Sequence, residues 1–340
     1  MSIPKNPIGL MKPLAIFAVL LSTFIYAKNI FCITYPPKAR IVEFTYGMQI
    51  TGLPGDAHNL KIWIPAASEN PYQNVTLNTE YPIVSPKIAH DKLFHNKILY
   101  YSFKSPKDEV RVDLDYKVKR YERFSGLLGK NRLDREKKKN LAKYLASNWL
   151  MVISKEIEDL AAQIVKGKTT TIEKARAIYD YCLATLSYDK SIPGWGNGDS
   201  LRACSVKAGN CTDFHSLFVS LARASNIPAK FVIGFSIPKQ KEGEIDSYHC
   251  WAEFYDDNKG WVPVDISEAW KNRERADYYF GNLDEDRIEF TEGRDIILEP
   301  PANAGALNYF IYPYAEIEGK PVKNVKTYFR FKEIPEWQGV

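Results

Sequence analysis

Motifs for metals, phosphates and dinucleotides are missing from this chain of 340 residues. Its five cysteines form no CxxC pair, and its five histidines do not stand at the spacing of a zinc site. The chain contains neither a phosphate-binding loop nor a dinucleotide fingerprint. The acidic residues 284–286 lack the pattern of an EF-hand calcium loop. We therefore expect the protein to work without a metal or an organic cofactor.

A strong charge of one sign is also missing. The formal net charge is +5, and two of the positive charges, Lys5 and Lys12, lie in residues 1–27, which contain no acid, so that +3 remains (5 − 2). The densest basic run, residues 135–139, is typical of a solvated helix face. No basic patch alternates with aromatic residues in the manner of single-strand binders, so we expect no nucleic acid partner.

The N-terminal segment predicts export. An apolar run of about fourteen residues over 14–27 follows the two lysines, which favours a signal peptide because a spanning helix needs about 20 residues. Cleavage is expected near Ala27, and the alternative is an uncleaved membrane anchor that continues toward Ile33. We therefore expect a periplasmic or secreted protein, with membrane contact if the leader remains. The odd number of cysteines in such a protein draws attention to an unpaired thiol, and a disulfide between Cys182 and Cys204 is one possible pairing.

The chain before residue 125 has the character of strands. Short segments rich in β-branched and aromatic residues, each bounded by Pro, Gly or Asn, recur between residues 38 and 120. We predict an all-β, sandwich-like N-terminal domain over residues 28–125. A second strand-rich stretch predicts a C-terminal β-hairpin extension over residues 301–340.

The middle of the chain changes to helical periodicity. Thr170 and Glu173 have the spacing of a capping box ahead of an apolar helix. Gly and Pro interrupt residues 188–209, so we predict little regular structure there, and a loop of that length tends to be functional. The helical pattern resumes at Cys211 and is followed by strands. We therefore predict an α+β domain over residues 130–300.

One thiol stands where a helix is predicted to begin. In the stretch GNCTDFH, Asn210 is a good N-cap, which places Cys211 in the first helical turn. The positive end of the helix dipole favours a thiolate, and free backbone N–H groups in that turn can bind a developing oxyanion. An enzyme that transfers acyl groups through a thiol needs both effects. The alternative is a small buried hydrophobic residue, the common role of a free cysteine.

A histidine and an aspartate are predicted to meet. His249 lies on the first strand of a predicted hairpin, and Asp265 lies on the second. If residues 256–258 form the loop, these two residues are direct cross-strand neighbours. Trp251 shares their face, whereas Cys250 lies on the opposite face with the core residues. Together with the thiol above, they supply a nucleophile, a base and a group that orients the base.

The blocks GNCTDFHSLFVSLARASNIPAKFVIGF, YHCWAEFY and GWVPVD resemble the Cys, His and Asp blocks of the transglutaminase-like superfamily. The resemblance covers roughly residues 170–270 and implies a papain-like α+β core, in which a helix bearing the cysteine packs on an antiparallel sheet. It implies Cys211 as the nucleophile, His249 as the general base and Asp265 as the residue that orients the imidazole. One departure is that Ile-Ser replaces the common Pro-Thr after the aspartate.

Four other residues are candidates for oxyanion or substrate contacts. Many members of the superfamily supply an oxyanion donor upstream of the cysteine, which makes the indole of Trp195 a candidate, with packing beneath a loop as its alternative. Asn210 and Asp213 flank the thiol, and Asp213 is expected either to cap the helix or to contact the substrate. Trp251 is a candidate because it shares a face with the histidine. His215, one turn after the thiol, is expected to have a supporting or packing role.

Three hypotheses about function follow. The first is acyl transfer on peptide or glutamine carboxamide substrates through a thioester, with hydrolysis favoured over crosslinking to an amine. A peptide or protein is then the partner, and cell-envelope material is a candidate. The second is a non-catalytic binding or scaffold module, against which the intact Cys-His-Asp set argues. The third is a redox thiol, which needs Cys204 or Cys250 within reach of Cys211.

Overall fold

The computed structural model describes residues 37–78, 84–106, 108–124 and 138–335. Residues 37–340 form one compact unit. The leader predicted over residues 1–27 lies outside the described residues. Within the described ranges, no helix combines the length and the apolar character that crossing a membrane requires.

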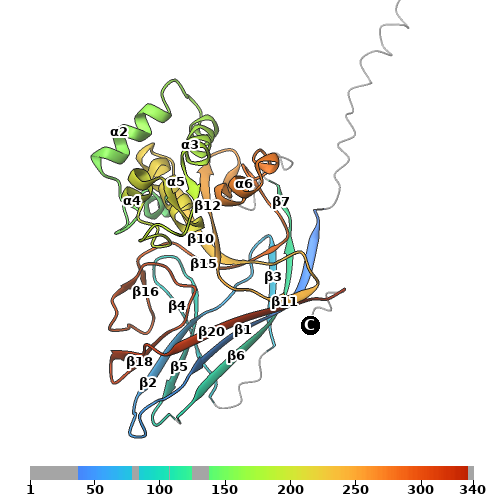
Figure 1. Cartoon of the computed structure of the whole chain (residues 1–340), viewed down its shortest axis with the longest axis vertical. Coiled ribbons are helices and arrows are strands. Elements are labelled where there is room, and N and C mark those ends of the chain that lie inside the picture. Colours follow the sequence, from blue (N-terminus) through green and yellow to red (C-terminus); the bar gives the residue numbers. More distant parts are fainter. Residues whose placement is uncertain (1–36, 79–83, 107, 125–137, 336–340) are drawn as a thin grey trace, which may run out of the picture. The chain divides into compact units, whose positions relative to one another are not determined.

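Two five-stranded antiparallel sheets carry the strand-rich parts of the chain (Figure 1). The first contains β1 (Ala39–Ile50), β3 (Gln73–Leu77), β6 (Val110–Tyr121), β11 (Glu242–Glu244) and β20 (Val325–Glu333), in the order β11-β20-β1-β6-β3. The second contains β2 (Leu60–Pro65), β4 (Lys87–His90), β5 (Lys97–Phe103), β18 (Tyr314–Ile317) and β19 (Lys320–Pro321), in the order β19-β18-β2-β5-β4.

Alternation of apolar residues builds the core between these sheets. Every second residue of β1 from Val42 to Ile50 is buried, because successive side chains of a strand point to opposite faces. The buried side chains of both sheets belong to one hydrophobic cluster, in which Phe44 represents the first sheet and Ile62 the second. The prediction of a sandwich-like fold for the N-terminal region is confirmed.

The C-terminal strands complete this sandwich. β20 pairs with β1 from Val42↔Glu333 to Ile50↔Val325, and β18 pairs with β2. The hairpin expected within residues 301–340 is present as the β18–β19 pair, but its strands belong to the sandwich and do not form a separate extension. This long-range pairing covers backbone groups of β1 and β2 that would otherwise stand at open sheet edges.

A four-stranded antiparallel sheet and a group of helices form the rest of the unit (Figure 1). The strands are β10 (Ala229–Ser236), β12 (His249–Asp256), β13 (Gly260–Val264) and β15 (Arg287–Glu292), in the order β13-β12-β10-β15. Helix α5 (Cys211–Ala224) packs on β12 and β10, and its residues 211–223 are all buried. Around α5 lie α2 (Lys155–Ile164), α3 (Thr171–Thr185), α4 (Ser200–Val206) and α6 (Ile266–Lys271). This arrangement confirms the predicted α+β core.

The stretch 188–209 is more regular than we predicted, because it contains α4. Asp199 caps this helix by accepting hydrogen bonds from the backbone N–H groups of Leu201 and Arg202, and Lys207 ends it in the left-handed conformation. The short elements are β7 (Arg123–Phe124), α1 (Lys138–Leu141), η2 (Ala142–Tyr144), β8 (Ser187–Tyr188), β9 (Ala208–Gly209), η3 (Arg273–Arg275), β14 (Asn282–Leu283), β16 (Ile296–Ile297) and β17 (Ala306–Leu307).

Aromatic rings join the sandwich to the four-stranded sheet. The ring centroid of Phe235 on β10 lies 4.4 Å from that of Phe329 on β20 and 5.1 Å from that of Phe44 on β1. Phe290 of β15 contacts both Phe44 and Phe235. These apolar contacts therefore attach the sheet that carries His249 to the sandwich.

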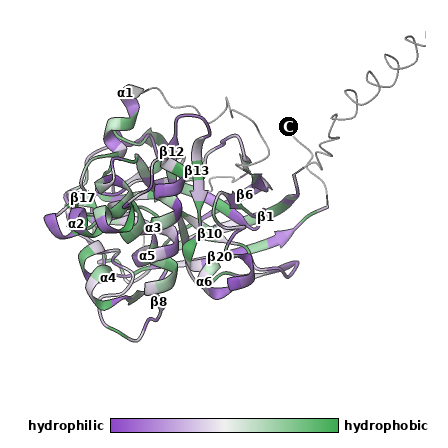
Figure 2. Cartoon of the chain, turned by 90° about the horizontal axis from the view of Figure 1, so that it is seen from above, coloured by the Kyte–Doolittle hydropathy of each residue, from purple (hydrophilic) through white to green (hydrophobic). Residues whose placement is uncertain are grey.

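Figure 2 shows that hydrophilic and hydrophobic residues alternate around α2, which buries one side only.

Candidate active site

Cys211 is the first residue of helix α5, and its side chain is only 2% exposed. The side chain of Asn210 caps the helix by accepting a hydrogen bond of 2.9 Å from the backbone N–H of Thr212. A hydrogen bond from the Cys250 thiol and the neighbouring His249 imidazole together outweigh burial, so the pKa of the Cys211 thiol lies well below its ordinary value. Both contacts therefore favour the thiolate form of Cys211 in the first helical turn.

His249 is the first residue of β12, and its Nε2 lies 2.7 Å from Oδ2 of Asp265. Burial by itself lowers the pKa of His249, but the Asp265 carboxylate and the Cys211 sulfur outweigh burial and raise the pKa to about 10. Both neighbours therefore favour the protonated form of the His249 imidazole, which contacts the Cys211 sulfur and the Asp265 carboxylate. A thiolate paired with an imidazolium is the activated form of a cysteine nucleophile.

Asp265 reaches His249 by a different route from the one we predicted. The hairpin register pairs Val264 with Ala252 rather than with Cys250, a shift of two residues. The cause is the turn, in which the Asp256 carboxylate accepts hydrogen bonds from two following backbone N–H groups and Gly260 adopts a φ of 76°. β13 ends at Val264, so Asp265 is the N-cap of α6 and meets His249 through its side chain alone.

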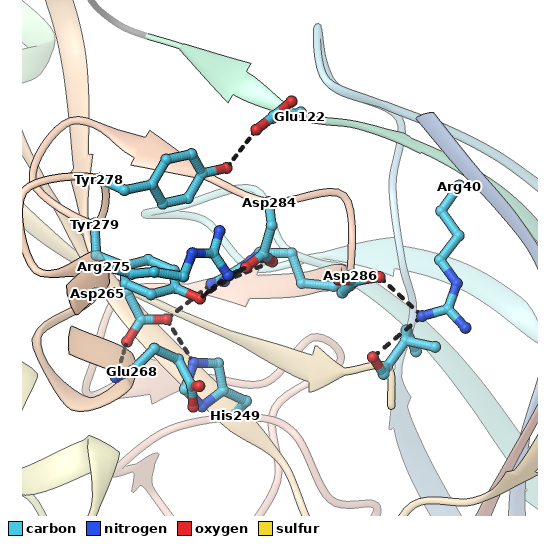
Figure 3. A network of polar contacts seen from close by, with 12 residues as sticks. Arg40, Glu122, His249, Asp265, Glu268, Arg275, Tyr278, Tyr279, Asp284 and Asp286 are labelled. Atoms are coloured by element: carbon cyan, nitrogen blue, oxygen red, sulfur yellow. Dashed lines mark hydrogen bonds and ion pairs between the residues drawn. The ribbon is translucent and has the colours of Figure 1, made fainter. Parts of the chain in front are cut away.

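Four hydrogen bonds fix the Asp265 carboxylate, which is fully buried (Figure 3). Oδ1 accepts from the hydroxyl of Ser267 and from the backbone N–H of Glu268, at 3.1 and 3.0 Å. Oδ2 accepts from His249 and, at 2.9 Å, from a guanidinium N–H of Arg287. The His249 and Arg287 charges outweigh burial and hold the pKa of Asp265 well below its ordinary value. The carboxylate that faces His249 is therefore ionised and held in one orientation.

His215 supports the site from within the protein and is fully buried. Its Nε2 accepts a hydrogen bond of 3.0 Å from the backbone N–H of Ile266, so its proton lies on Nδ1, which donates to the Cys211 carbonyl oxygen at 2.7 Å. Burial lowers the pKa of His215. This neutral imidazole therefore ties the first turn of α5 to the start of α6, in line with the expected supporting role.

Asp213 anchors the loop that precedes the nucleophile. Its carboxylate is fully buried and accepts hydrogen bonds from the backbone N–H groups of Gly196, Gly198 and Asn210, at 2.7, 3.3 and 2.9 Å. This is the capping alternative, and no face of this carboxylate is open to a substrate. Trp195 lies in the anchored loop with 40% of its surface exposed, and the Lys190 ammonium stands 5.3 Å from its ring centroid.

Trp251 lies beneath the site rather than at its surface. Its side chain is fully buried with Val232 and Leu283, so the structure does not support the predicted substrate contact. Its ring lies 6.4 Å from that of His249, and the Arg287 guanidinium stands 5.4 Å from its centroid. Trp251 therefore packs against His249 and Arg287 on the interior side of the site.

Three tyrosines beside the first turn of α5 were not predicted. The Tyr248 hydroxyl lies 2.8 Å from the Thr212 hydroxyl, and its ring packs against those of Tyr309 and Tyr312 at 5.6 and 5.9 Å. Burial first, and then the neighbouring Cys211 charge, raise the pKa of Tyr248, so it stays a neutral hydroxyl. Tyr248 precedes the histidine in sequence, but no local signal points to two tyrosines from the C-terminal segment.

Cys250 is a further residue that the sequence placed in the core and the structure places at the thiol. It lies on the face of β12 toward α5, where its sulfur is 3.8 Å from both the Thr212 hydroxyl and Nδ1 of His215. Burial and the adjacent Cys211 raise the pKa of Cys250 well above its ordinary value. It therefore stays protonated and donates to the thiolate. Cys182, Cys204, Cys211 and Cys250 are all free thiols.

Replacing Cys250 with alanine is expected to slow alkylation of Cys211 at pH 6 about tenfold. A hydrogen bond to a charged group contributes roughly 1.5–3 kcal/mol, so its loss raises the pKa of Cys211 by about one unit or more. The pH dependence of the iodoacetamide reaction, followed by peptide mass spectrometry, measures this shift. Cys250→Ser keeps a donor and should stay closer to the wild type. An unchanged midpoint in Cys250→Ala would show that this thiol does not act on Cys211.

Among the residues that the structure describes, no three His, Cys, Asp or Glu side chains are grouped as ligands. Among the acidic residues 284–286, Asp284 pairs with Arg287 and Asp286 pairs with Arg40. These two carboxylates therefore serve internal ion pairs.

Comparisons with known proteins show similarity of sequence and of fold. Residues 158–266 match the model of the transglutaminase-like superfamily. An uncharacterized protein of Haemophilus influenzae is 27% identical over an alignment of 329 residues, which covers 85% of this chain and 89% of that protein. The uncharacterized protein YebA of Bacillus subtilis is 25% identical over 154 residues, or 40% of this chain and 21% of that protein. A solved structure from Cytophaga hutchinsonii, described as a "Putative Cysteine Protease", has a TM-score of 0.54 at 13% identity and covers 90% of this chain and 94% of that chain.

The matched segment runs from α2 to the first residue of α6 and contains Cys211, His249 and Asp265. The likeness to the Cytophaga structure extends the shared fold over most of the chain, including the sandwich. Residues 158–266 are therefore similar to the core of the transglutaminase-like superfamily.

Proposed function

We propose that this protein is an enzyme that transfers acyl groups through a thiol and acts on peptide or glutamine carboxamide groups. The observation that carries the proposal is the buried set in which His249 stands between the Cys211 sulfur and the Asp265 carboxylate, at the N-terminus of α5. A binding module has no use for a cysteine that is held as a thiolate beside an imidazolium.

In the proposed reaction the Cys211 thiolate attacks the carbonyl carbon of the substrate. The oxyanion of the tetrahedral adduct forms at the N-terminal end of α5, where the helix dipole favours negative charge. His249 gives its proton to the leaving amine, and a thioester to Cys211 remains. Asp265 holds the imidazole at 2.7 Å and stabilises its positive charge. Water, deprotonated by His249, or an incoming amine then resolves the thioester.

We favour water as the acceptor, so the proposed activity is that of a cysteine protease or amidase. Its support is the shared fold with the Cytophaga protein described as a "Putative Cysteine Protease". Because residues 1–27 predict export, we also propose a periplasmic or secreted location. Peptide-bearing cell-envelope material is the substrate class that fits this location. Crosslinking to an amine is the alternative outcome of the same intermediate.

The proposal is tested by incubating the wild-type protein and Cys211→Ala with a library of glutamine-containing peptides, with and without a labelled primary amine. Mass spectrometry should find shortened or deamidated peptides with the wild type alone. Peptides labelled with the amine, again with the wild type alone, would identify a crosslinking transglutaminase. Equal products from both proteins, with a Cys211 that resists alkylation, would refute an enzyme and leave a binding module.

A further inference from the structure

A buried guanidinium stands behind the proposed catalytic aspartate. Arg287 is 1% exposed and lies on β15, beyond the segment that matches the family model. One of its N–H groups donates to Oδ2 of Asp265 at 2.9 Å. The same oxygen accepts from Nε2 of His249 at 2.7 Å. The arginine and the histidine therefore share one carboxylate oxygen.

The opposite edge of this guanidinium is also fixed. Its Nε and second terminal nitrogen donate to Oδ1 of Asp284, at 3.2 and 2.9 Å. The other oxygen of Asp284 accepts from the Tyr279 hydroxyl at 2.9 Å, and Arg275 lies 3.6 Å from it (Figure 3). The Trp251 ring lies 5.4 Å from the centre of the guanidinium. Asp284 and the Trp251 ring therefore fix the orientation in which the Arg287 guanidinium contacts Asp265.

The charge balance of the site depends on this residue. Asp265 and Asp284 are buried carboxylates on either side of Arg287, and the charge of each opposes ionisation of the other unless a cation separates them. The titratable and charged groups that face this set come from several neighbouring elements: Arg120 of β6, Tyr179 of α3, Cys211 and His215 of α5, His249 and Cys250 of β12, Glu268 and Lys271 of α6, Tyr188 of β8, and Tyr279 and Arg275.

We propose that Arg287 is a positioning residue for the reaction, which fixes the Asp265 carboxylate against His249 and thereby maintains the Cys211–His249 ion pair. The inference rests on the proposed function of Cys211. The planar guanidinium suits this position, because Nε and one terminal nitrogen donate to Asp284 while the other terminal nitrogen donates to Asp265. Lysine has the charge but not the fork, so it satisfies only part of the role.

Loss of the guanidinium acts on the nucleophile through two steps. Without it, one of the two carboxylates takes up a proton or Asp265 turns away from His249. The imidazole then loses its anionic partner and is less readily protonated, and the Cys211 thiolate loses its cation. Removal of a buried positive charge from the site disfavours the thiolate in addition. Both effects raise the pH at which Cys211 becomes reactive.

The test compares Arg287→Met and Arg287→Lys with the wild type, using the pH dependence of Cys211 alkylation by iodoacetamide and the melting temperature. We expect the midpoint to rise by about one unit in Arg287→Met, with about tenfold slower alkylation at pH 6, and to rise less in Arg287→Lys. Arg40→Met is the matched control, because Arg40 is another buried arginine bound to a carboxylate, that of Asp286 at 2.8 Å (Figure 3). It should leave the midpoint unchanged even where it lowers the melting temperature.

The outcomes separate this inference from the proposed function. Wild-type midpoints in both Arg287 variants would overturn the positioning role and leave the Cys211 nucleophile intact. A wild-type protein whose Cys211 reacts only near pH 9 would overturn the proposed function, and the inference with it. If Arg287→Met does not fold, the Arg287→Lys midpoint decides, since an unshifted midpoint in a variant without the fork contradicts the proposal.

Discussion

Replacing His249 with alanine is expected to slow the alkylation of Cys211 at pH 6 by about a hundredfold. The wild-type pKa of Cys211 is well below its ordinary value because Cys250 and His249 contact the sulfur. Without the imidazolium the pKa returns toward about 8.5 or above, where under one per cent of the thiol is ionised at pH 6. The greater nucleophilicity of the more basic thiolate restores only part of the lost rate.

The sign of the pH dependence distinguishes this from a general loss of structure. Wild-type reactivity should already be high in mild acid and change little up to pH 8, whereas reactivity of His249→Ala should keep rising above pH 8. His90→Ala is a suitable control, because His90 is an exposed residue of β4 in the sandwich. The reading of Cys211 as a nucleophile activated by His249 fails if the two alanine variants have the same profile.

Replacing Asp265 with asparagine is expected to lower the turnover of peptide substrates by about 10³- to 10⁴-fold. The amide of asparagine can bond to the imidazole but cannot stabilise its positive charge, and it favours the wrong tautomer. It also leaves Arg287 without one of its two carboxylate partners in the interior. Breaking a buried ion pair costs roughly 3–5 kcal/mol, so we also expect a large loss of unfolding free energy in urea.

A matched variant separates loss of charge from loss of a helix cap. Asn is as good an N-cap as Asp, so the capping of α6 should survive in Asp265→Asn. Asp199→Asn makes the same change at the N-cap of α4 and should alter the unfolding free energy by only about 0.5 kcal/mol. Comparable losses of unfolding free energy in the two variants would mean that the Asp265 charge contributes nothing beyond the cap.

The pH dependence of stability follows from the same pair. The depressed pKa of Asp265 adds stability above the unfolded pKa of about 3.9, and this stability is lost as the pH falls further. The pKa of His249, raised to about 10, adds stability that is complete below the unfolded value of about 6.5 and is lost as the pH rises toward 10. The contribution of the pair is therefore greatest between about pH 4 and 6.5, and Asp265→Asn should remove this maximum.

Local patterns in the sequence were sufficient to place Cys211 at the start of a helix and His249 at the start of a strand. Asn210 caps α5 as its residue type predicts, and the strand that begins at His249 is read from its apolar and aromatic residues. The register of the hairpin was predicted wrongly by two residues, because the Asp256 side chain stabilises a turn one residue further on. His249 and Asp265 still meet despite this error, because Asp265 is the N-cap of α6 and its side chain reaches the imidazole.

Residues that act across long sequence separations could not be predicted in this way. Arg287 follows Asp265 by more than twenty positions in an acidic stretch without a recognisable motif, and only the sheet order brings β15 beside β10. Cys250 has the spacing of a core residue, and it is one. Its contact with the Cys211 sulfur depends on how α5 packs on β12, which the sequence pattern does not reveal. The pairing of β20 with β1 leaves no trace in either strand taken alone.

That pairing of β20 with β1 also sets the order in which the chain can fold. Strand β1 lies between β6, which follows it within about 60–80 residues, and β20, whose residues 325–333 follow it only after about 275–290 residues. Until those residues emerge, one edge of β1 stays open and the sandwich core lacks Phe329 and Phe331. Non-local pairing of this kind is slow, because the loop must close before the contacts form. The first sheet to begin forming is therefore among the last to be finished, and a chain released early would expose an aggregation-prone edge at its N-terminal strand.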